Sequence, residues 1–180
     1  MNCPVCKIEE LNPVELEGDL QAFECPKCKG NFIPYFNYQK FLENRTLNMD
    51  IIDKVKFNKV FNNKDDDTLK NCPECGKVLV ARKAGFGLEF YIEKCEHCSG
   101  IWLDNNEWNF LKESNLENNI YYIFSSSWQN YVHKQEVHEI KINNIKKYFS
   151  DEQSEKIIDF LDWLDNQENK REIQSYIISN

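Results

Sequence analysis

The cysteines are the feature of this sequence that most restricts how the chain can fold. All eight of them lie in four Cys-x-x-Cys pairs. Two residues between the members of a pair let both sulfurs turn toward one metal ion, and two pairs supply the four soft ligands of a tetrahedral site. The spacing Cys-x2-Cys-x18/19-Cys-x2-Cys predicts two zinc sites. Their ligands are Cys3, Cys6, Cys25 and Cys28 in the first, and Cys72, Cys75, Cys95 and Cys98 in the second.

Four thiolates close the coordination sphere of zinc, so we expect two structural zinc ions per chain and no metal-activated water. A structural site contributes roughly 10–16 kcal/mol, whereas the core of a mini-domain rarely contributes more than about 3–5 kcal/mol. The alternative uses of these cysteines are dithiol redox switching, disulfides, and iron or an iron–sulfur cluster. A cross-braced arrangement, with ligands shared between the sets, is disfavoured because each set is already complete.

The two cysteine sets belong to an internal repeat. Residues 25–33 align with residues 95–103 at an offset of 70, and the pairs upstream of them align at an offset of 69. In the second spacer, the strand-like runs 78–82 and 88–92 flank Ala84-Gly85-Phe86-Gly87, which predicts a β-hairpin. The first spacer has Glu17-Gly18-Asp19 near its middle and predicts another. We therefore expect two zinc ribbons, with positive φ at Gly30, Gly76 and Gly100, just beyond the ligands.

A short helix is expected after each hairpin. Asp104 is followed three residues on by Glu107, which predicts a capping box that begins a helix through Leu111. In the first repeat the equivalent apolar spacing is kept by Tyr38 and Phe41. The acidic residues near the end of 43–69 indicate a connector with a solvated tip.

The repeat stops after residue 113. Residues 120–124 and 137–142 are predicted as strands from their β-branched and aromatic content. Ser150, three residues before Gln153, predicts a capping box for an acidic helix of about residues 151–165. That helix carries an apolar stripe of Ile157, Leu161 and Leu164, which fits an internal core or a dimer interface equally well.

The predicted fold class is α+β: two small zinc-ribbon β-hairpin units, each followed by a short helix, plus a C-terminal mixed extension ending in an acidic helix. The predicted domains are 1–42 for the first ribbon, 43–69 for the connector, 70–113 for the second ribbon and 114–180 for the C-terminal extension.

Charge and targeting signals restrict the partners. The formal net charge is -8, and residues 150–180 hold eight Asp or Glu against three Lys or Arg, which disfavours polyanionic partners. The amino terminus lacks the pattern of a secretory signal, and no apolar run approaches the roughly 20 residues of a membrane helix. Cysteines in close pairs suit a reducing compartment, so we expect a cytoplasmic protein without a membrane partner.

Three histidines, two aromatic residues and a small basic cluster are the other candidate functional residues. His97 lies inside a cysteine knuckle and is expected to be an exposed side chain, while His133 and His138 are expected at the surface or in ordinary packing. Phe32 and Trp102 occupy the same repeat position and are expected to cap the core beside the zinc, rather than to stack on a base. The nearest approach to a basic patch consists of Lys77, Arg82 and Lys83.

Residues 72–76, Cys-Pro-Glu-Cys-Gly, together with residues 95–107 resemble the prokaryotic family of transcription-factor-IIB-type zinc ribbons. The run Gly-x-Trp-Leu-Asp-x-x-Glu is the specific part of the resemblance. It is close over 70–113 and weaker over 1–42, where Phe32, Ile33 and Pro34 replace Trp-Leu-Asp. The resemblance implies zinc ligation by both cysteine sets and a link with transcription, and it gives Asp104 and Glu107 no catalytic role.

These observations favour a non-enzymatic zinc-binding adaptor or regulatory protein that acts through protein–protein interaction. The alternative is a nucleic-acid-binding transcriptional regulator that uses the ribbon hairpins. A thiol redox sensor is the third hypothesis. A reactive cysteine, a nucleophile with its base or an open metal site would be needed for an enzyme, and the sequence shows none of these, so we expect no catalytic residues.

Overall fold

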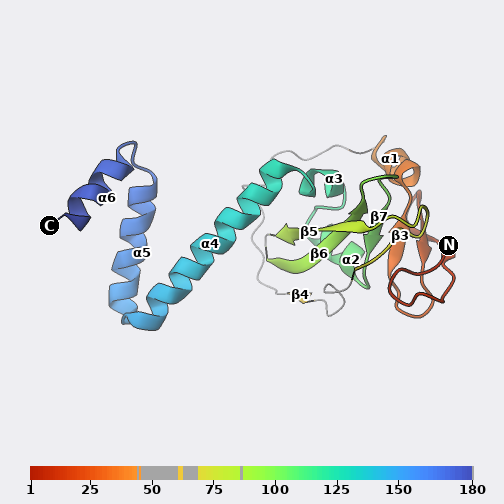
Figure 1. Cartoon of the computed structure of the whole chain (residues 1–180), viewed down its shortest axis with the longest axis horizontal. Coiled ribbons are helices and arrows are strands. Elements are labelled where there is room, and N and C mark those ends of the chain that lie inside the picture. The colour runs from red at the N-terminus through yellow and green to blue at the C-terminus, as the bar shows by residue number, and fades with distance from the viewer. Residues whose placement is uncertain (44, 46–60, 63–68, 86, 180) are drawn as a thin grey trace. The chain divides into compact units, whose positions relative to one another are not determined.

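The computed structural model describes residues 1–43, 45, 61–62, 69–85 and 87–179, so most of the predicted connector lies outside the described residues. The chain forms two compact units, Met1–Val132 and His133–Asn180, here called the zinc unit and the helical unit (Figure 1). The domain boundaries predicted from the repeat stay a prediction. The fold class is α+β, as predicted, with a mostly antiparallel sheet in the zinc unit and helices in the C-terminal part.

The first repeat forms a hairpin, a third strand and a helix: β1 Asn12–Glu17, β2 Leu20–Glu24, β3 Asn31–Ile33 and α1 Tyr35–Glu43. The second forms β5 Leu79–Gly85, β6 Leu88–Cys95, β7 Ile101–Leu103 and α2 Glu107–Glu113. A two-residue strand between them, β4 Phe61–Asn62, pairs in parallel with β6. Both predicted hairpins are present.

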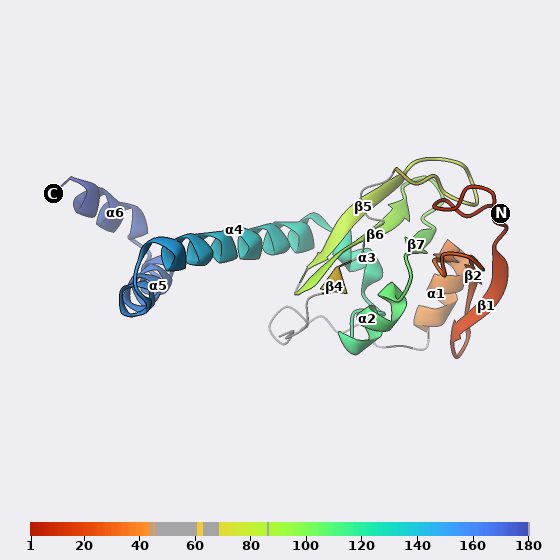
Figure 2. The same ribbon diagram turned by 90° about the horizontal axis from the view of Figure 1, so that it is seen from below.

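One sheet joins the two repeats. Strand β3 of the first repeat pairs in antiparallel fashion with β7 of the second, and the sheet runs β1-β2-β3-β7-β6, with β5 and β4 also paired to β6. Figure 2 shows β7 lying between the β5–β6 hairpin and the strands of the first repeat. Phe32 is opposite Trp102 at this junction, so the pairing brings the same repeat position of each ribbon together.

Alternation along the strands separates two cores. In β6, the residues Leu88, Phe90 and Ile92 are buried in a cluster with α1, α2 and the residues that follow them, whereas Trp102 of β7 belongs to a second cluster beside the cysteines. Successive side chains of a strand point to opposite faces of the sheet. The helices therefore cover one face, and the zinc-ligand clusters lie toward the other.

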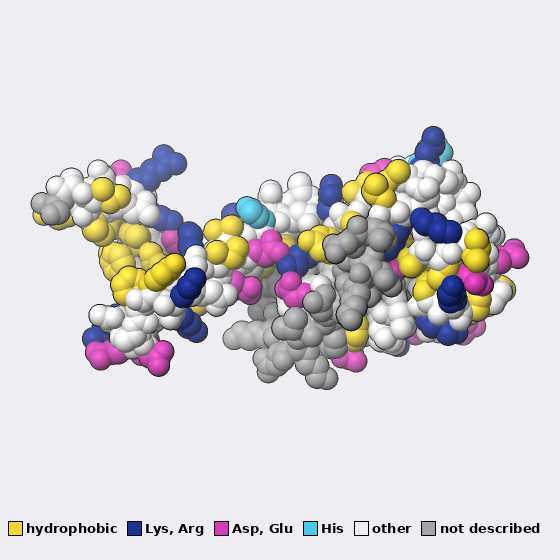
Figure 3. Space-filling view, turned by 60° about the horizontal axis from the view of Figure 1, so that its bottom comes forward, with side chains coloured by type: hydrophobic (Ala, Val, Ile, Leu, Met, Phe, Trp, Pro, Cys, Tyr) yellow, Lys and Arg dark blue, Asp and Glu magenta, His cyan; other side chains and the backbone are white. Residues whose placement is uncertain are grey.

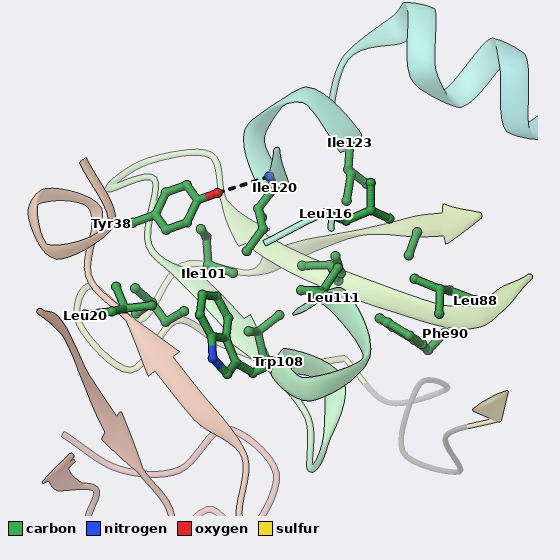
Figure 4. Packing of buried hydrophobic residues seen from close by; sticks show 14 of the residues in the cluster. Leu20, Tyr38, Leu88, Phe90, Ile101, Trp108, Leu111, Leu116, Ile120 and Ile123 are labelled. Atoms are coloured by element: carbon green, nitrogen blue, oxygen red, sulfur yellow. Dashed lines mark hydrogen bonds between the residues drawn. The ribbon is translucent and has the colours of Figure 1, made fainter. Parts of the chain in front are cut away.

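The helix-covered core is tied together by Tyr38 of α1 (Figure 4). Its hydroxyl donates to the Glu117 carbonyl at 2.7 Å and accepts from the Ile120 backbone N–H at 3.1 Å. Burial raises the pKa of this phenol well above its ordinary value. Tyr38 thus links the first repeat to a segment beyond the second.

The strands predicted at residues 120–124 and 137–142 are wrong. They belong to helix α3 Ile120–Ile123 and helix α4 Ser126–Tyr148. Ile120 and Ile123 are buried one helical turn apart in the core. The prediction relied on β-propensity, which packing readily overrides. The C-terminal extension is therefore helical, not mixed, in the residues that the structure describes.

The first turn of α4 covers the outer edge of β5. Trp128 Nε1 donates to the Ala84 carbonyl at 2.9 Å, and Gln129 Nε2 donates to the Lys83 carbonyl at 3.0 Å. These bonds occupy carbonyls that an edge strand would otherwise offer to another chain. Gly85, with φ +77°, allows this approach, because a Cβ there would overlap the Val132 side chain.

Helices α5 Asp151–Asp165 and α6 Lys170–Ile178 complete the helical unit. The capping box at Ser150 is confirmed, because the Ser150 and Gln153 side chains bond each other's backbone N–H groups. None of the helices within the described part of the chain combines the length and apolar character needed to cross a membrane.

Candidate metal centres

Each predicted ligand set comes together within its own repeat. In the first set, the Sγ atoms of Cys3 and Cys28 lie 3.5 Å apart, and those of Cys6 and Cys25 lie 3.8 Å apart. All four sulfurs in each set lie within 4.8 Å of one another. The cysteines form the two groups that the spacing predicted, and no ligand is shared between repeats.

The second set has the same geometry. The Sγ atoms of Cys72 and Cys98 lie 3.4 Å apart, as do those of Cys75 and Cys95. Ligands about 2.3 Å from a tetrahedral zinc ion lie about 3.8 Å from one another, so both sets match the size of such a site. No disulfide joins the eight cysteines. The two groups fit two structural zinc ions.

Local backbone turns aim the sulfurs. The residue after the second cysteine of each knuckle has positive φ and donates its N–H to the carbonyl of the first cysteine. These residues are Lys7, Lys29, Gly76 and Ser99. The knuckle N–H groups also point at sulfur, as from Cys6 to Cys3 Sγ at 3.2 Å. Such donors stabilise a thiolate.

The expectation of positive φ is confirmed at Gly76 and is wrong at Gly30 and Gly100. Glycine is required at these two positions because a side chain would overlap a neighbouring aromatic ring. A Cβ at Gly30 would overlap the Trp102 ring, and a Cβ at Gly100 would lie 2.5 Å from Cζ of Phe32. Each ribbon's glycine thus accommodates the other ribbon's aromatic ring, and both rings are fully buried. Phe32 and Trp102 seal the junction between the two metal centres, which agrees with the structural role expected of them.

The thiol environments suit a bound cation. Burial raises the pKa of Cys3 and of Cys72 to about 11, although knuckle N–H groups act in the opposite direction. Burial also disfavours the thiolates of Cys25 and Cys95, but hydrogen bonds outweigh it there and lower the pKa. A divalent cation would stabilise all four thiolates of a set together, so metal binding and proton release are coupled.

A buried charge cluster, Lys70, Glu93 and Asp104, braces the second ribbon. Lys70 Nζ lies 2.5 Å from Glu93 Oε1 and 2.5 Å from Asp104 Oδ2, and all three side chains are buried. Burial alone would lower the pKa of Lys70, but attraction to the two carboxylates outweighs burial and raises it. Asp104 also accepts from Trp102 Nε1 at 2.7 Å, so the cluster holds the ring at the ribbon junction.

The predicted capping box at Asp104 is only half present. The Glu107 side chain accepts from the Asp104 backbone N–H at 2.8 Å, as a capping box requires. The residue that precedes α2 is however Asn106, in a left-handed conformation and without a side-chain cap. The Asp104 carboxylate instead accepts from the Lys70 ammonium and from Trp102 Nε1. A charge-assisted hydrogen bond such as that from Lys70 is stronger than one from a backbone N–H.

Sequence reasoning missed Lys70 and Glu93. Neither belongs to a motif, and Lys70 lies 23 residues from Glu93 and 34 residues from Asp104 along the chain. The repeat itself carried the signal. Phe23 takes the place of Glu93 opposite β3, Met1 takes the place of Lys70 next to the knuckle, and Pro34 replaces Asp104. The first ribbon therefore has an uncharged side chain at each of the three positions that form the charge cluster in the second.

The remaining candidate residues lie away from the sulfurs or at the surface. His97 and His133 are exposed, and His138 is half-buried in the helical unit. Lys77 and Arg82 are exposed, while Lys83 forms an ion pair of 2.8 Å with Glu89. Glu89 thus offsets part of the positive charge of the basic patch.

Comparison with known proteins agrees with this geometry. The searches of curated proteins and of solved structures found no match. The model of the transcription factor zinc-finger family, a zinc ribbon of the TFIIB type, matches residues 2–44 and again residues 71–114. Each match contains one complete set of four cysteines and the strands that position it. Both segments therefore match the TFIIB-type zinc-ribbon model, which is consistent with a tandem repeat of this ribbon.

Proposed function

We propose that this protein is a non-enzymatic adaptor or regulator whose zinc ions are structural and which acts by binding another protein. Four cysteines at each centre supply the complete ligand set of a tetrahedral zinc ion, which suits a structural role. The two repeats share one sheet, so the two centres would hold a single rigid body for presentation to a partner. Their thiolates suit a reducing compartment, and we place the protein in the cytoplasm.

The observation that carries the proposal is the exposure of large apolar side chains on the helical unit. Phe160, Trp163 and Ile177 are between 42% and 52% exposed, and Tyr176 and Ile178 still more. Ser154 and Leu164 are its only buried residues in the part that the structure describes. Exposed apolar surface of this kind is typical of a protein-interaction site.

Nucleic-acid binding through the ribbon hairpins is the second candidate, and the description of the matching family favours it. The pairing of Lys83 with Glu89 and the net charge of -8 act against it. Phosphate contacts require an excess of exposed Lys and Arg on one face.

Site-specific photo-crosslinking in intact cells separates the two candidates. A photoreactive phenylalanine analogue would replace Arg82 on β5, Phe36 on α1 or Tyr176 on α6, one at a time, in the full chain. We expect a protease-sensitive adduct of defined mass at one position or more. Nuclease-sensitive adducts confined to Arg82 would support the nucleic-acid hypothesis, and the absence of a protein adduct at all three positions would refute the adaptor function.

A further inference from the structure

Helix α5 has apolar side chains on more than one face. The predicted stripe turns mostly inward: Leu164 is buried, and Leu161 lines a hollow of about 70 Å³ with Ile142 and Ile145 of α4 and Ile158 of α5. Leu161 and Leu164 therefore serve the interior of the helical unit. They are therefore not available to a dimer interface, and the exposed apolar surface of α5 lies on another face of the helix.

That second face is formed by Phe160 and Trp163. The two rings are one helical turn apart, with centroids at 5.7 Å, and they are 42% and 50% exposed. Half-buried Ile157 lies one turn before Phe160. Figure 3 shows hydrophobic side chains gathered at the surface of this unit. Helix α5 is thus apolar toward its neighbours and again toward solvent.

Helix α5, which carries the aromatic pair, is rich in acidic side chains. Helix α5 contains six carboxylates and one lysine, Lys156, which is paired with Glu152 at 2.7 Å. Asp165 is paired with Lys170 at 2.6 Å. The exposed carboxylates that remain are Asp151, Glu155, Asp159 and Asp162. Their field attracts cations and repels a second copy of the same face, a nucleic acid or an anionic lipid surface.

We propose that the Phe160–Trp163 face of α5 docks a basic amphipathic helix of a partner protein. The partner's apolar stripe would cover the two rings, and its flanking Lys or Arg would meet the carboxylates of α5. Aromatic side chains of this kind are the usual anchors of such contacts. The inference rests on the proposed adaptor function and names the partner chemistry.

The test uses the zinc-loaded full chain and a fluorescein-labelled 18-residue peptide of Leu and Lys patterned as an amphipathic helix. Fluorescence anisotropy would measure its Kd for the wild type, Phe160→Ala, Trp163→Ala, and Phe36→Ala as the matched control. Phe36 is an aromatic that is 80% exposed on the zinc unit. We expect Trp163→Ala and Phe160→Ala each to weaken binding about 30-fold and Phe36→Ala to leave it unchanged. Raising NaCl from about 50 to about 500 mM should also weaken binding, because salt screens the attraction between the peptide's lysines and the carboxylates of α5.

Three results would overturn the assignment. Equal affinity of the wild type and both α5 variants for the peptide is the first, and equal affinity for a peptide with Glu in place of Lys is the second. The third is a dimer, seen by light scattering, that Trp163→Ala abolishes. If the peptide test fails while photo-crosslinks to a protein persist at Phe36 or Arg82, the adaptor function stands and the α5 assignment falls.

Discussion

Replacing Lys70 by methionine should be among the most destabilising single changes in the zinc unit. Methionine keeps a chain of similar length but removes the ammonium that lies 2.5 Å from each of two buried carboxylates. Glu93 and Asp104 then face each other across a site closed to water, and Asp104 retains only Trp102 among its side-chain donors described above. The side chain that remains is accommodated, but the charge balance is lost.

The magnitude follows from the burial of all three groups. Removing one partner of a buried ion pair costs about 3–5 kcal/mol, because the charge left behind stays desolvated. That range corresponds to a loss of roughly a hundredfold to several thousandfold in the folding equilibrium constant. An exposed pair is worth about 0–1 kcal/mol, so Lys112→Met, which breaks a half-exposed pair with Glu17, should cost less than about 1 kcal/mol.

Urea unfolding of the zinc-saturated protein, followed by tryptophan fluorescence, measures these differences. Lys70→Met/Glu93→Gln/Asp104→Asn removes all three charges and should recover much of the loss, while the asparagine oxygen still accepts from Trp102. If Lys70→Met costs no more than Lys112→Met, the cluster is not the brace described above. The same conclusion follows if the triple variant is less stable than Lys70→Met.

The pH dependence has a definite sign. The raised pKa of Lys70 means that its stabilising contribution is complete below the ordinary lysine pKa of 10.5, and is lost as the pH rises through its higher folded-state pKa. The stability difference between the wild type and Lys70→Met should therefore be constant from about pH 7 to 9 and shrink at strongly alkaline pH. A difference that already fell between these two values would contradict the assignment.

Three further changes test the ribbon junction and the core. Gly100→Ala should cost about 1–3 kcal/mol through overlap with Phe32, and Phe32→Leu in the same chain should relieve part of it in urea titrations; additive costs would argue against the contact. Tyr38→Phe should cost about 1–3 kcal/mol, because the buried Ile120 N–H and the Glu117 carbonyl lose their partner, and a change in thermal midpoint below experimental error would contradict this. Cys98→Ser should lower the zinc content from two ions to one by elemental analysis. Because β3 pairs with β7, it should also speed the removal of the remaining ion by a chelator, and an unchanged rate would show that the ribbons are independent.

The metal ligands were predictable because the decisive geometry is local. Two residues between cysteines fix a knuckle, and a hairpin of 18 or 19 residues returns the chain to the same point. The capping box at Ser150 is local too, since both of its hydrogen bonds join residues three apart. Short-range interactions of this kind are encoded by spacing and residue type, so the sequence alone determined the two ribbons, their ligands and the start of α5.

Only the tertiary structure decided how these parts are used. Asp104 had two competing roles, and the approach of Lys70, 34 residues away in sequence, settled which one its carboxylate serves. Residues 120–123 form a helix because Ile120 and Ile123 pack into the core from one helical face. The pairing of Phe32 with Trp102, and the inward turn of Leu164 that leaves Trp163 exposed, depend in the same way on surfaces assembled from distant segments. Local spacing specifies a turn or a ligand set, but which face becomes buried is set by the free energy of packing the whole chain.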